Sequence, residues 1–393
     1  MFIAALVLFI LSAFLVFYTY VFFPWLIELI SGKSKMNADV YPDSDACPSV
    51  SILIAAFNEE KVIEAKLTSI LNSNFPSDKF EILIGSDAST DRTADLVKAF
   101  STSDPRIKLH EFELRRGKPS VVNDLVALSQ NELIILTDAN VLFEEGAIFN
   151  LLRHFKNSKI GLVGANILNV GQMKDGISHQ ETSYIARENR IKYFEGIRWG
   201  VMMGPFGGCF ALRKSLYKSV PANFLVDDFY ICMQILKQNF NCINELKAIC
   251  YEDVSNDIKQ EYRRKARISA GNFQNLREFS SYLLRPFSPA GFCFISHKVL
   301  RWLTPFFLLI SLLSLGVLSR THNFYAFLLI GELFLLFTPL LDAILSKLGL
   351  HWKLLRFVSY FSYMNLALLK GFFRFINGIQ SSVWTPTVRN TTP

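Results

Sequence analysis

The sequence predicts an α/β domain with a mostly parallel sheet, set between apolar helices near the two ends of the chain. Apolar residues make up 51% of the 393 residues and charged residues only 19%, which is too apolar for an ordinary soluble protein of this length. The apolar residues are concentrated at the N-terminus and after residue 301, whereas residues 48–285 alternate between short β-branched runs and helical patterns. Together these observations predict a membrane-anchored α/β protein.

The first 26 residues carry no charged side chain, and Glu28 is the first in the chain. At a rise of ~1.5 Å per residue, such a helix crosses a hydrocarbon core of ~30 Å. A cleaved signal peptide would need a basic start and a small-residue cleavage site, and neither is evident. We therefore expect residues 1–30 to be a retained transmembrane anchor. Lys33 and Lys35 follow it directly, and the positive-inside rule then places residues 48–285 in the cytosol.

Residues 48–285 show the strand–helix alternation of an α/β domain. Short apolar runs end in polar residues, and each is followed by a stretch with apolar residues at helical spacing. Because fully apolar strands need cover on both faces, this alternation predicts a mostly parallel sheet between two layers of helices. In order, we predict strands over 49–57, 80–87, 107–112 and 132–140, and helices over 61–73, 91–100 and 118–129.

Polar side chains follow three of these strands at the point where each strand ends, at residues 58–60, at Asp87 and at residues 138–140. Ligands of such sheets bind beyond the carboxyl ends of the strands, so these residues are candidates for one ligand site. A turn at Asp87 and a helix cap at Asp91 are the alternative, because Asp is common at both positions. The sequence has no glycine-rich dinucleotide or P-loop motif, so we expect a nucleotide to be held by carboxylates and a cation.

Two further apolar stretches lie near the C-terminus, at residues 302–318 and 324–345. Basic residues precede the first and follow the second, which predicts a cytosolic entry and a cytosolic return. A third stretch, residues 357–369, is shorter than the ~20 residues that a span usually needs, and an interfacial helix, a re-entrant helix and a third span are all open for it. We therefore expect a C-terminal membrane domain over 286–380 and a tail over 381–393.

The six cysteines show no C-x-x-C spacing. In a cytosolic domain they are expected to be reduced packing residues, and a metal cluster among them is not expected. They are Cys47, Cys209, Cys232, Cys242, Cys250 and Cys293.

Seven motifs follow one another along the chain: AAFNEEKVIEAKLTSIL, GSDASTDRTADLV, RRGKPSVVN, LTDANV, GPFGGCFALRKS, LVDDFYICMQIL and EYRRKARISAGNFQNL. Through this ordered set the chain resembles a membrane-anchored family 2 glycosyltransferase with the nucleotide-sugar-binding A-type fold, of the cellulose- and hyaluronan-synthase-like superfamily. The resemblance covers nearly the whole chain. It implies an inverting hexosyl- or N-acetylhexosaminyl-transferase of the inner or plasma membrane, with a nucleotide sugar as donor, a saccharide acceptor and no nucleic-acid partner.

The resemblance also implies roles for four residues on the nucleotide side. Asn58 and Glu59 would lie beside the nucleoside, and Asp87 would accept a hydrogen bond from the uracil ring of a UDP-sugar. Lys118 would reach the nucleotide end of the donor, and a solvent-exposed surface lysine is the alternative for it. UDP is favoured over GDP only through the resemblance.

Asp138 takes the first position of the family's D-x-D element, which faces the diphosphate and its divalent cation. A hard cation with oxygen ligands, Mg²⁺ or Mn²⁺, can neutralise the charge that develops on a departing nucleoside diphosphate. The second position is Asn140 where the family often has Asp, so a neutral oxygen would bind the cation more weakly. The resemblance therefore implies a cation site with Asp138 as its main ligand and Asn140 as its lesser one.

Glycines and arginines complete the implied donor site. Gly207 and Gly208 would let the backbone approach the sugar or the acceptor closely. Arg264 and Arg267, in the run RRKAR, would bind the diphosphate. For these arginines, solvated or lipid-facing positions next to a membrane segment are the alternative.

The tandem acids Asp227 and Asp228 match the catalytic acids of the family, and Asp228 matches its base. A base must take the proton of the attacking hydroxyl across about 2.6–3.2 Å. Tandem acids also commonly begin a helix, and both roles are compatible.

One departure limits the implied activity. Processive synthases of this family carry Q-x-x-R-W, and this chain keeps Gln260 and Arg263 but has Arg264 at the tryptophan position. We therefore expect transfer of one or few sugars to a lipid-linked or membrane-proximal acceptor. A processive synthase with SSVWTPTVR as a gating element is the alternative. A non-enzymatic scaffold or transporter is also open, and Glu332 and Asp342 within an apolar stretch would be its best support.

Overall fold

The computed structural model describes residues 1–171, 177–253, 257–350, 352–379 and 383. Contacts divide the chain into two compact units. The helical unit comprises Met1–Leu29, Met173–Gln180 and Asn256–Gly378, and the sheet unit comprises Ile30–Gln172, Glu181–Ser255 and Ile379–Pro393. This division assigns residues 257–350 and 352–378 to the helical unit, and the predicted domain limits at 30, 48, 285 and 380 stay predictions.

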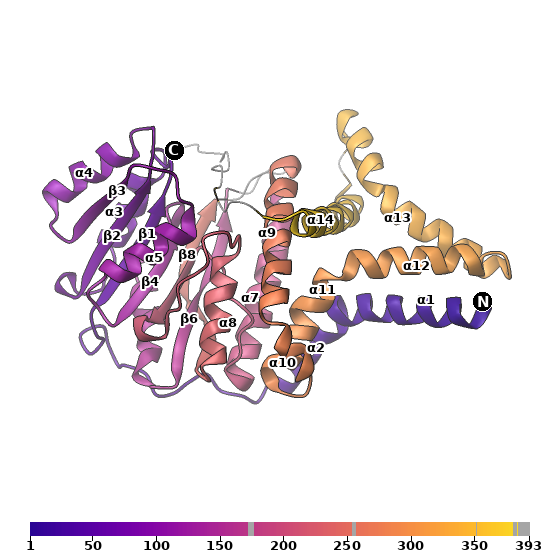
Figure 1. Ribbon diagram of the computed structural model, residues 1–393, viewed down its shortest axis with the longest axis horizontal. Helices are drawn as coiled ribbons and strands as arrows, with labels where there is room; N and C mark the ends of the chain where they lie inside the picture. Colours follow the sequence, from indigo (N-terminus) through magenta and orange to yellow (C-terminus); the bar gives the residue numbers. More distant parts are fainter. Residues whose placement is uncertain (172–176, 254–256, 351, 380–382, 384–393) are drawn as a thin grey trace. The chain divides into compact units, whose positions relative to one another are not determined.

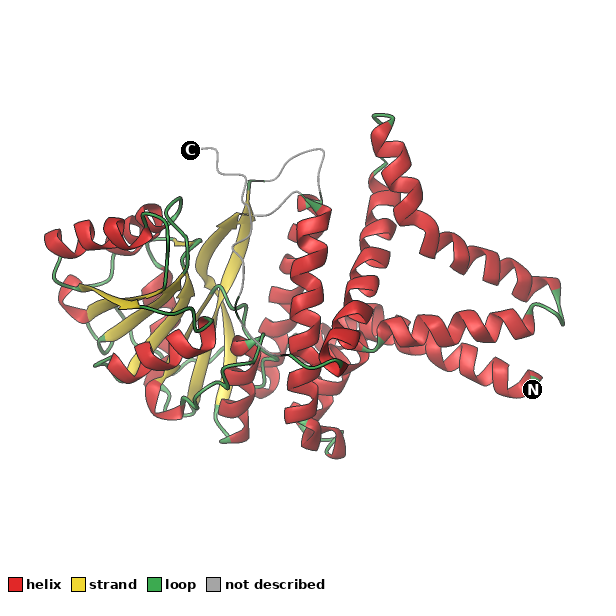
Figure 2. Cartoon of the chain, turned by 45° about the horizontal axis from the view of Figure 1, so that its top comes forward, coloured by secondary structure: helices red, strands yellow, loops and turns green. Residues whose placement is uncertain are grey.

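Eight strands form one sheet in the sheet unit, in the order β3-β2-β1-β4-β7-β6-β8-β5 (Figures 1 and 2). All four strands predicted from the sequence are present. The bounds are β1 Val50–Ala56, β2 Phe80–Asp87, β3 Ile107–Phe112, β4 Leu133–Asp138, β5 Val141–Phe143, β6 Ile160–Val170, β7 Cys209–Arg213 and β8 Asn241–Asp253.

The sheet is mixed. Strands β3, β2, β1 and β4 are parallel to one another, as the strand–helix alternation predicts. Strand β7 is antiparallel to both β4 and β6, and β5 is antiparallel to β8, whereas β6 and β8 are parallel. Ala55 lies opposite Asp138, and Ala56 lies opposite Ser86. The ends of β1, β2 and β4 therefore meet at one edge of the sheet.

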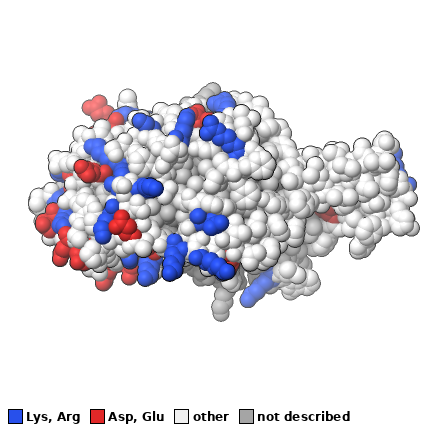
Figure 3. Space-filling model, turned by 90° about the horizontal axis from the view of Figure 1, so that it is seen from below, with Lys and Arg blue, Asp and Glu red and all other residues white. Residues whose placement is uncertain are grey.

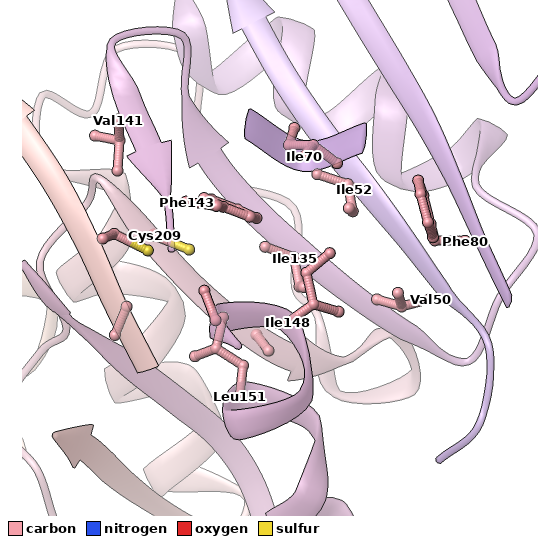
Figure 4. Packing of buried hydrophobic residues seen from close by; sticks show 14 of the residues in the cluster. Val50, Ile52, Ile70, Phe80, Ile135, Val141, Phe143, Ile148, Leu151 and Cys209 are labelled. Carbon is pink, nitrogen blue, oxygen red and sulfur yellow. The ribbon is translucent and has the colours of Figure 1, made fainter. Parts of the chain in front are cut away.

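Helices cover both faces of this sheet. One face packs against α3, α4 and α6 through a continuous apolar cluster that includes Ile52, Ile70, Ile135 and Leu151 (Figure 4). The opposite face packs against α5 and α8, and a Cβ added at Gly161 of β6 would lie 2.6 Å from Ile235 of α8. Burial of these side chains is the main stabilising contribution to such a core. The helix bounds are α3 Ile63–Leu71, α4 Thr93–Ser103, α5 Lys118–Leu128, α6 Ala147–Leu152, α7 Ser178–Trp199 and α8 Asp227–Lys237.

The helical unit contains the apolar segments. Its elements are α1 Phe2–Phe17, α2 Phe23–Ser31 (which extends into the sheet unit), α9 Ile258–Glu278, α10 Pro289–Cys293, α11 Leu300–Trp302, α12 Thr304–Leu318, α13 Asn323–Lys347 and α14 Lys353–Ile376. In the described part of the chain, two helical segments are long and apolar enough to cross a membrane, Phe2–Ser31 and Asn323–Lys347. A third is possible by the same measure if Pro289–Trp302 and Thr304–Leu318, bent by 59°, form one span. Figure 3 shows almost no charged side chain over the helices at the right of the view. Two of the three predicted long apolar segments, residues 1–30 and 324–345, are thus confirmed as helices that fit membrane anchoring, whereas residues 302–318 qualify only as part of the bent pair.

The acids Glu332 and Asp342 both have partners on neighbouring helices. Ser311 of α12 donates to Glu332 of α13 at 2.8 Å. Arg356 of α14 lies 3.9 Å from Asp342. Each acid thus has a polar neighbour on an adjacent helix, and a transport role for them stays a prediction.

Helix α14 includes the short stretch whose membrane role was open. It packs along α9, where Ser269 Oγ donates to Leu368 O at 2.8 Å. Its buried side includes Ser359 and Asn365, so the helix presents polar side chains to its neighbours. Among the described helices, α14 is not one of those long and apolar enough to cross a membrane. The interfacial, re-entrant and third-span alternatives for residues 357–369 stay predictions.

Candidate active site

The loop after β1 is joined to the loop after β2 by side-chain hydrogen bonds. Asn58 has φ +53°, a left-handed conformation that Asn adopts more readily than most residues. Its Oδ1 accepts from the backbone N of Thr90 at 2.8 Å. The backbone N of Glu59 donates to Thr93 Oγ1 at 2.8 Å. The two residues predicted to lie beside the nucleoside are therefore at the edge where β1 and β2 end, and they hold the two loops there together.

Asp87 is completely buried at the end of β2. Its Oδ1 accepts from the backbone N of Arg116 at 2.7 Å, and its Oδ2 accepts from that of Gly117 at 3.0 Å. The guanidinium of Arg115 adds an ion pair at 3.6 Å. Asp87 thus orients the loop that leads into α5 at Lys118. Its predicted contact with a uracil ring stays a prediction.

The structure agrees with the alternative interpretation of Asp91 as a helix cap. Its Oδ1 accepts from the backbone N of Thr93 at 3.0 Å, at the start of α4. Its Oδ2 accepts from the backbone N of Glu60 at 3.1 Å. Asp91 therefore satisfies backbone donors at a helix start, as a capping acid does.

Lys118 is the residue where three elements meet. It begins α5, after Gly117 with φ +84°, and its Nζ lies 2.6 Å from Asp138 Oδ1 at the end of β4. The same nitrogen lies 3.9 Å from Asp227 Oδ2 at the start of α8. Burial lowers the pKa of Lys118, but the two carboxylates raise it by more, so the net pKa is above its usual range. Lys118 is only 26% exposed and ion-paired, which argues against the surface-lysine alternative.

The turn from Asp138 to Asn140 offers oxygen atoms that suit a hard cation. The backbone N of Asp138 donates to Gly208 O at 3.0 Å, and its side chain is about one-third exposed (34%). Asn140 donates through Nδ2 to Glu252 Oε1 at 3.3 Å, so its amide oxygen is the group suited to a cation. A carboxylate and an amide oxygen fit Mg²⁺ or Mn²⁺ when diphosphate oxygens complete the coordination. Within the described ranges, no three His, Cys, Asp or Glu side chains gather at ligand spacing.

Asp228 packs against the glycine loop before β7. A Cβ added at Gly207 would lie 2.9 Å from Asp228 Oδ2, and one at Gly208 would lie 3.0 Å from Val141 Cγ2. Burial and the neighbouring Asp227 raise the pKa of Asp228 to about 6, against the lowering effect of Lys118. Both acids lie in the first turn of α8, as the helix-start interpretation predicts. The carboxylate is thus ionised at neutral pH yet more basic than an ordinary Asp.

Arg264 and Arg267 lie on α9, in the helical unit. Arg264 Nε donates to Glu261 Oε2 at 2.9 Å, and its Nη2 donates to Glu261 Oε1 at 3.1 Å. Arg264 is thus bound to a carboxylate of its own helix. The predicted diphosphate contacts of both arginines stay predictions.

The sequence interpretation missed three residues close to this site. Lys66 of α3 is completely buried below the Asp138 turn. Asn123 of α5 holds the segment before α8 by accepting from Tyr217 OH at 2.6 Å and donating to Val220 O at 2.9 Å. Lys192 of α7 lies 3.5 Å from the ring centre of Phe206 and lowers the pKa of Asp228. Only Lys66 has a local signal, since it occupies one position of the apolar stripe of its helix.

Residues 51–220 match the family model described as glycosyl transferase family 2. The chain is 26% identical over 240 residues to a poly-β-1,6-N-acetyl-D-glucosamine synthase of Staphylococcus epidermidis, which covers 59% of this chain and 57% of that protein. It is 30% identical over 118 residues to a β-monoglucosyldiacylglycerol synthase of Nostoc sp., which covers 30% of this chain and 25% of that protein. The chain thus spans just over half the length of the first relative and a quarter of the second.

A solved structure resembles nearly the whole chain. It is a mannosyltransferase from Pyrobaculum calidifontis in complex with GDP-Man and Mn²⁺, with a TM-score of 0.68 and 19% sequence identity. The likeness covers 94% of this chain and 99% of the other. At this identity it concerns the fold, and it confirms the predicted glycosyltransferase A-type fold.

Proposed function

Since residues 51–220 form a domain of glycosyl transferase family 2, we propose that the chain is an inverting glycosyltransferase with a nucleotide-sugar donor and Asp228 as its base. The observation that supports this best is the charge cluster at the sheet edge, where the Lys118 ammonium lies between Asp138 and Asp227. A cation beside the donor-side acid and a carboxylate of raised pKa are the two groups that a direct displacement needs.

In the proposed reaction the acceptor hydroxyl oxygen attacks the anomeric carbon of the donor sugar. The bond from that carbon to the diphosphate oxygen breaks as the new glycosidic bond forms. Asp228 takes the hydroxyl proton, for which its pKa of about 6 suits it at neutral pH. One displacement with one base inverts the configuration at the anomeric carbon.

Negative charge then develops on the leaving nucleoside diphosphate. We propose that Lys118 neutralises part of this charge, because it begins α5 beside Asp138. A divalent cation bound by Asp138 and Asn140 would supply further positive charge to the diphosphate oxygens. Gly207 and Gly208 let the loop before β7 pack directly on Asp228 and Val141, where a Cβ would lie 2.9 and 3.0 Å from them. We propose that this loop, free of side chains, faces the sugar or the acceptor.

The donor we propose is a UDP-sugar, on the family resemblance. The test is incubation of detergent-purified protein with UDP-glucose, UDP-N-acetylglucosamine and GDP-mannose, with and without Mg²⁺ or Mn²⁺, followed by measurement of released nucleotide. We expect metal-dependent release of UDP from one of the UDP-sugars. Release of GDP alone would show that the donor carries guanine and not uracil. If no nucleotide is released from any donor in the presence of membrane lipids, the proposed activity is contradicted.

The acceptor we propose is a lipid-linked or membrane-proximal saccharide, which receives one or few sugars. Two helices long and apolar enough to cross a membrane support an acceptor at the membrane. The Nostoc relative is named for a glycolipid product, and Arg264 occupies the position of the tryptophan of processive synthases. The size of the radiolabelled product distinguishes this from polymer synthesis.

A processive polysaccharide synthase is the alternative, because the Staphylococcus relative is named for a polysaccharide. Its proposed gating element, SSVWTPTVR, lies outside the described residues except for Val383. Long polymer made by purified protein supports this alternative and contradicts transfer of single sugars.

We further propose that the chain resides in the inner or plasma membrane with the sheet unit in the cytosol. Lys33 and Lys35 directly after the first apolar helix support this orientation. A reporter active only in the cytosol, fused after residue 60, tests it; an inactive reporter contradicts it.

A further inference from the structure

Lys66 is a buried cation that the proposed reaction does not use. It lies on α3, where it shares the buried side of the helix with Ile63, Leu67 and Ile70. Its side chain is completely inaccessible to solvent. Placing an ammonium group among apolar side chains is costly, so a lysine at such a position is a candidate for a function.

The Lys66 ammonium binds both sides of the turn that contains Asp138. Its Nζ donates to Thr137 Oγ1 at 2.8 Å, at the end of β4, and to the backbone carbonyl of Val141 at the start of β5. Phe143 of β5 adds a cation–π contact, with its ring centre 3.8 Å from Nζ. Val141 and Phe143 lie close together in this part of the core (Figure 4). One side chain therefore fixes the spacing between the two ends of the turn.

Thr137 extends this connection to the glycine loop. Its hydroxyl accepts from Lys66 and donates to Gly208 O at 2.8 Å. The same carbonyl accepts from the backbone N of Asp138 at 3.0 Å. The neighbouring Gly207 packs on the carboxylate of Asp228. Lys66 is thus linked, through one hydroxyl and one carbonyl, to the donor turn and to the loop that faces the base.

The charge of Lys66 is also placed to act on the diphosphate side. Burial lowers the pKa of Lys66 to about 8, while Cys209 of β7, Cys250 of β8 and Asp138 of β4 act in the opposite direction. The ammonium form therefore predominates at neutral pH. Among the described residues no carboxylate forms an ion pair with it, and Asp138 is the acid that acts on it from a longer distance.

We propose that Lys66 is a positioning residue for the proposed transfer reaction, whose buried ammonium fixes the Asp138–Asn140 turn and adds positive potential below the diphosphate. This inference rests on the proposed function. The Asn at position 140 makes the support more important, since a D-x-N turn has one ionic ligand instead of two. The group acts through Thr137 and Val141 and touches no substrate.

The test compares Lys66→Met with Lys98→Met, which removes an exposed lysine of α4 that pairs with Glu111 at 2.8 Å. Calorimetry measures the Kd of UDP and of GDP with Mn²⁺, and electron paramagnetic resonance measures bound Mn²⁺. Loss of a residue that holds a metal ligand in place typically lowers metal affinity about 10–100-fold. We therefore expect Lys66→Met to bind the nucleotide and Mn²⁺ at least about 10-fold more weakly than the wild type. Lys98→Met is expected to bind like the wild type.

The Tm of each variant separates positioning from a purely structural role. Methionine removes a costly buried charge but leaves Val141 O without its donor, so we expect a small change in Tm together with a large loss of binding. A lower Tm with Kd values within twofold of the wild type overturns the proposal. If the wild type binds neither nucleotide, the proposed function fails as well, whereas normal wild-type binding with an unaffected Lys66→Met contradicts only the role of Lys66.

Thr137→Val tests the same connection without altering the lysine. It removes the hydroxyl that joins Lys66 to Gly208 O, so it should weaken Mn²⁺ and nucleotide binding in the same direction as Lys66→Met. Because both changes interrupt one chain of contacts, the double variant should lose less than the product of the single losses. Multiplicative losses overturn the proposal. Unchanged binding by Thr137→Val overturns it too, even if Lys66→Met does not fold.

Discussion

Lys118 Nζ lies 2.6 Å from Asp138 Oδ1, which joins the first residue of α5 to the last residue of β4. Because the same ammonium lies 3.9 Å from Asp227, one cation links the donor-side acid to the pair that begins α8. Charge-assisted contacts of this kind are strong and specify geometry. The proposed donor site and the proposed base are therefore parts of one electrostatic unit.

The pH dependence of the reaction should follow Asp228. A base must be deprotonated, and the pKa of Asp228 is raised to about 6, so kcat/KM should fall tenfold per pH unit below about 6 and level off above it. Asp227 raises this pKa, so Asp227→Asn should move the inflection to lower pH. Lys118 lowers it, so Lys118→Met should move the inflection to higher pH. Profiles of kcat/KM for the three proteins check both signs; a shift to higher pH in Asp227→Asn would falsify the assignment.

Asp138 should account for the metal dependence. Asp138→Ala removes the one ionic oxygen ligand of the turn, and we expect kcat/KM to fall by about 10²–10³-fold at saturating Mg²⁺ or Mn²⁺. The measurement is nucleotide release as a function of metal concentration. Asp124→Ala, which removes an exposed acid paired with Arg116, is the matched control. Full metal-dependent activity in Asp138→Ala contradicts the proposed cation site.

Replacing Asn140 should make metal binding tighter under one condition. An Asp at this position would add an ionic ligand, but it would also face the carboxylate of Glu252, to which Asn140 Nδ2 now donates at 3.3 Å. Two close carboxylates disfavour ionisation, so Asn140→Asp alone should gain little. We expect the double variant with Glu252→Gln to need several-fold less Mn²⁺ for half-maximal activity. The prediction fails if metal requirements of the single and double variants are equal.

Gly207 should be intolerant of any side chain. A Cβ there would lie 2.9 Å from Asp228 Oδ2, so Gly207→Ala forces the base to move. Displacements of about 1 Å can cost 10²-fold in rate, and we expect kcat to fall by about that factor while nucleotide affinity changes little. Gly316→Ala, on α12 with open space around it, is the control. Equal kcat in Gly207→Ala and the wild type would show that Asp228 is not constrained by this loop.

The first half of the sheet could be predicted because its signals are local. Strands β1, β2 and β4 are short apolar runs, and each is followed or ended by the polar residues of the predicted site. The antiparallel pairing of β7 with β4 and β6 could not be predicted, since it depends on partners distant in the sequence. The family model independently supports the same domain.

The acidic residues of the candidate site could be predicted from the sequence, but the hydrogen bonds that join its segments could not. Asp87 has both oxygens bound by the backbone of residues 116 and 117, and spacing along the chain does not indicate that pairing. Lysine is usually exposed at the surface, although the position of Lys66 in the apolar stripe of α3 indicates that it is buried. The length of α14 was missed because Ser359, Ser362 and Asn365 interrupt its apolar pattern, while Ser362 donates to Leu335 O of α13 at 2.8 Å. The sequence does not indicate which polar residues form hydrogen bonds with another helix.

The most direct test of the account is a comparison of sugar transfer and nucleotide binding in Asp228→Asn. Asn keeps the shape of Asp and cannot take a proton, and burial disfavours the charge that it replaces, so the variant should fold with a Tm at or above that of the wild type at pH 7. We predict that it binds UDP with unchanged Kd and loses transfer by about 10²–10⁴-fold. Turnover equal to that of the wild type, with UDP binding intact, would contradict the assignment of Asp228 as the base.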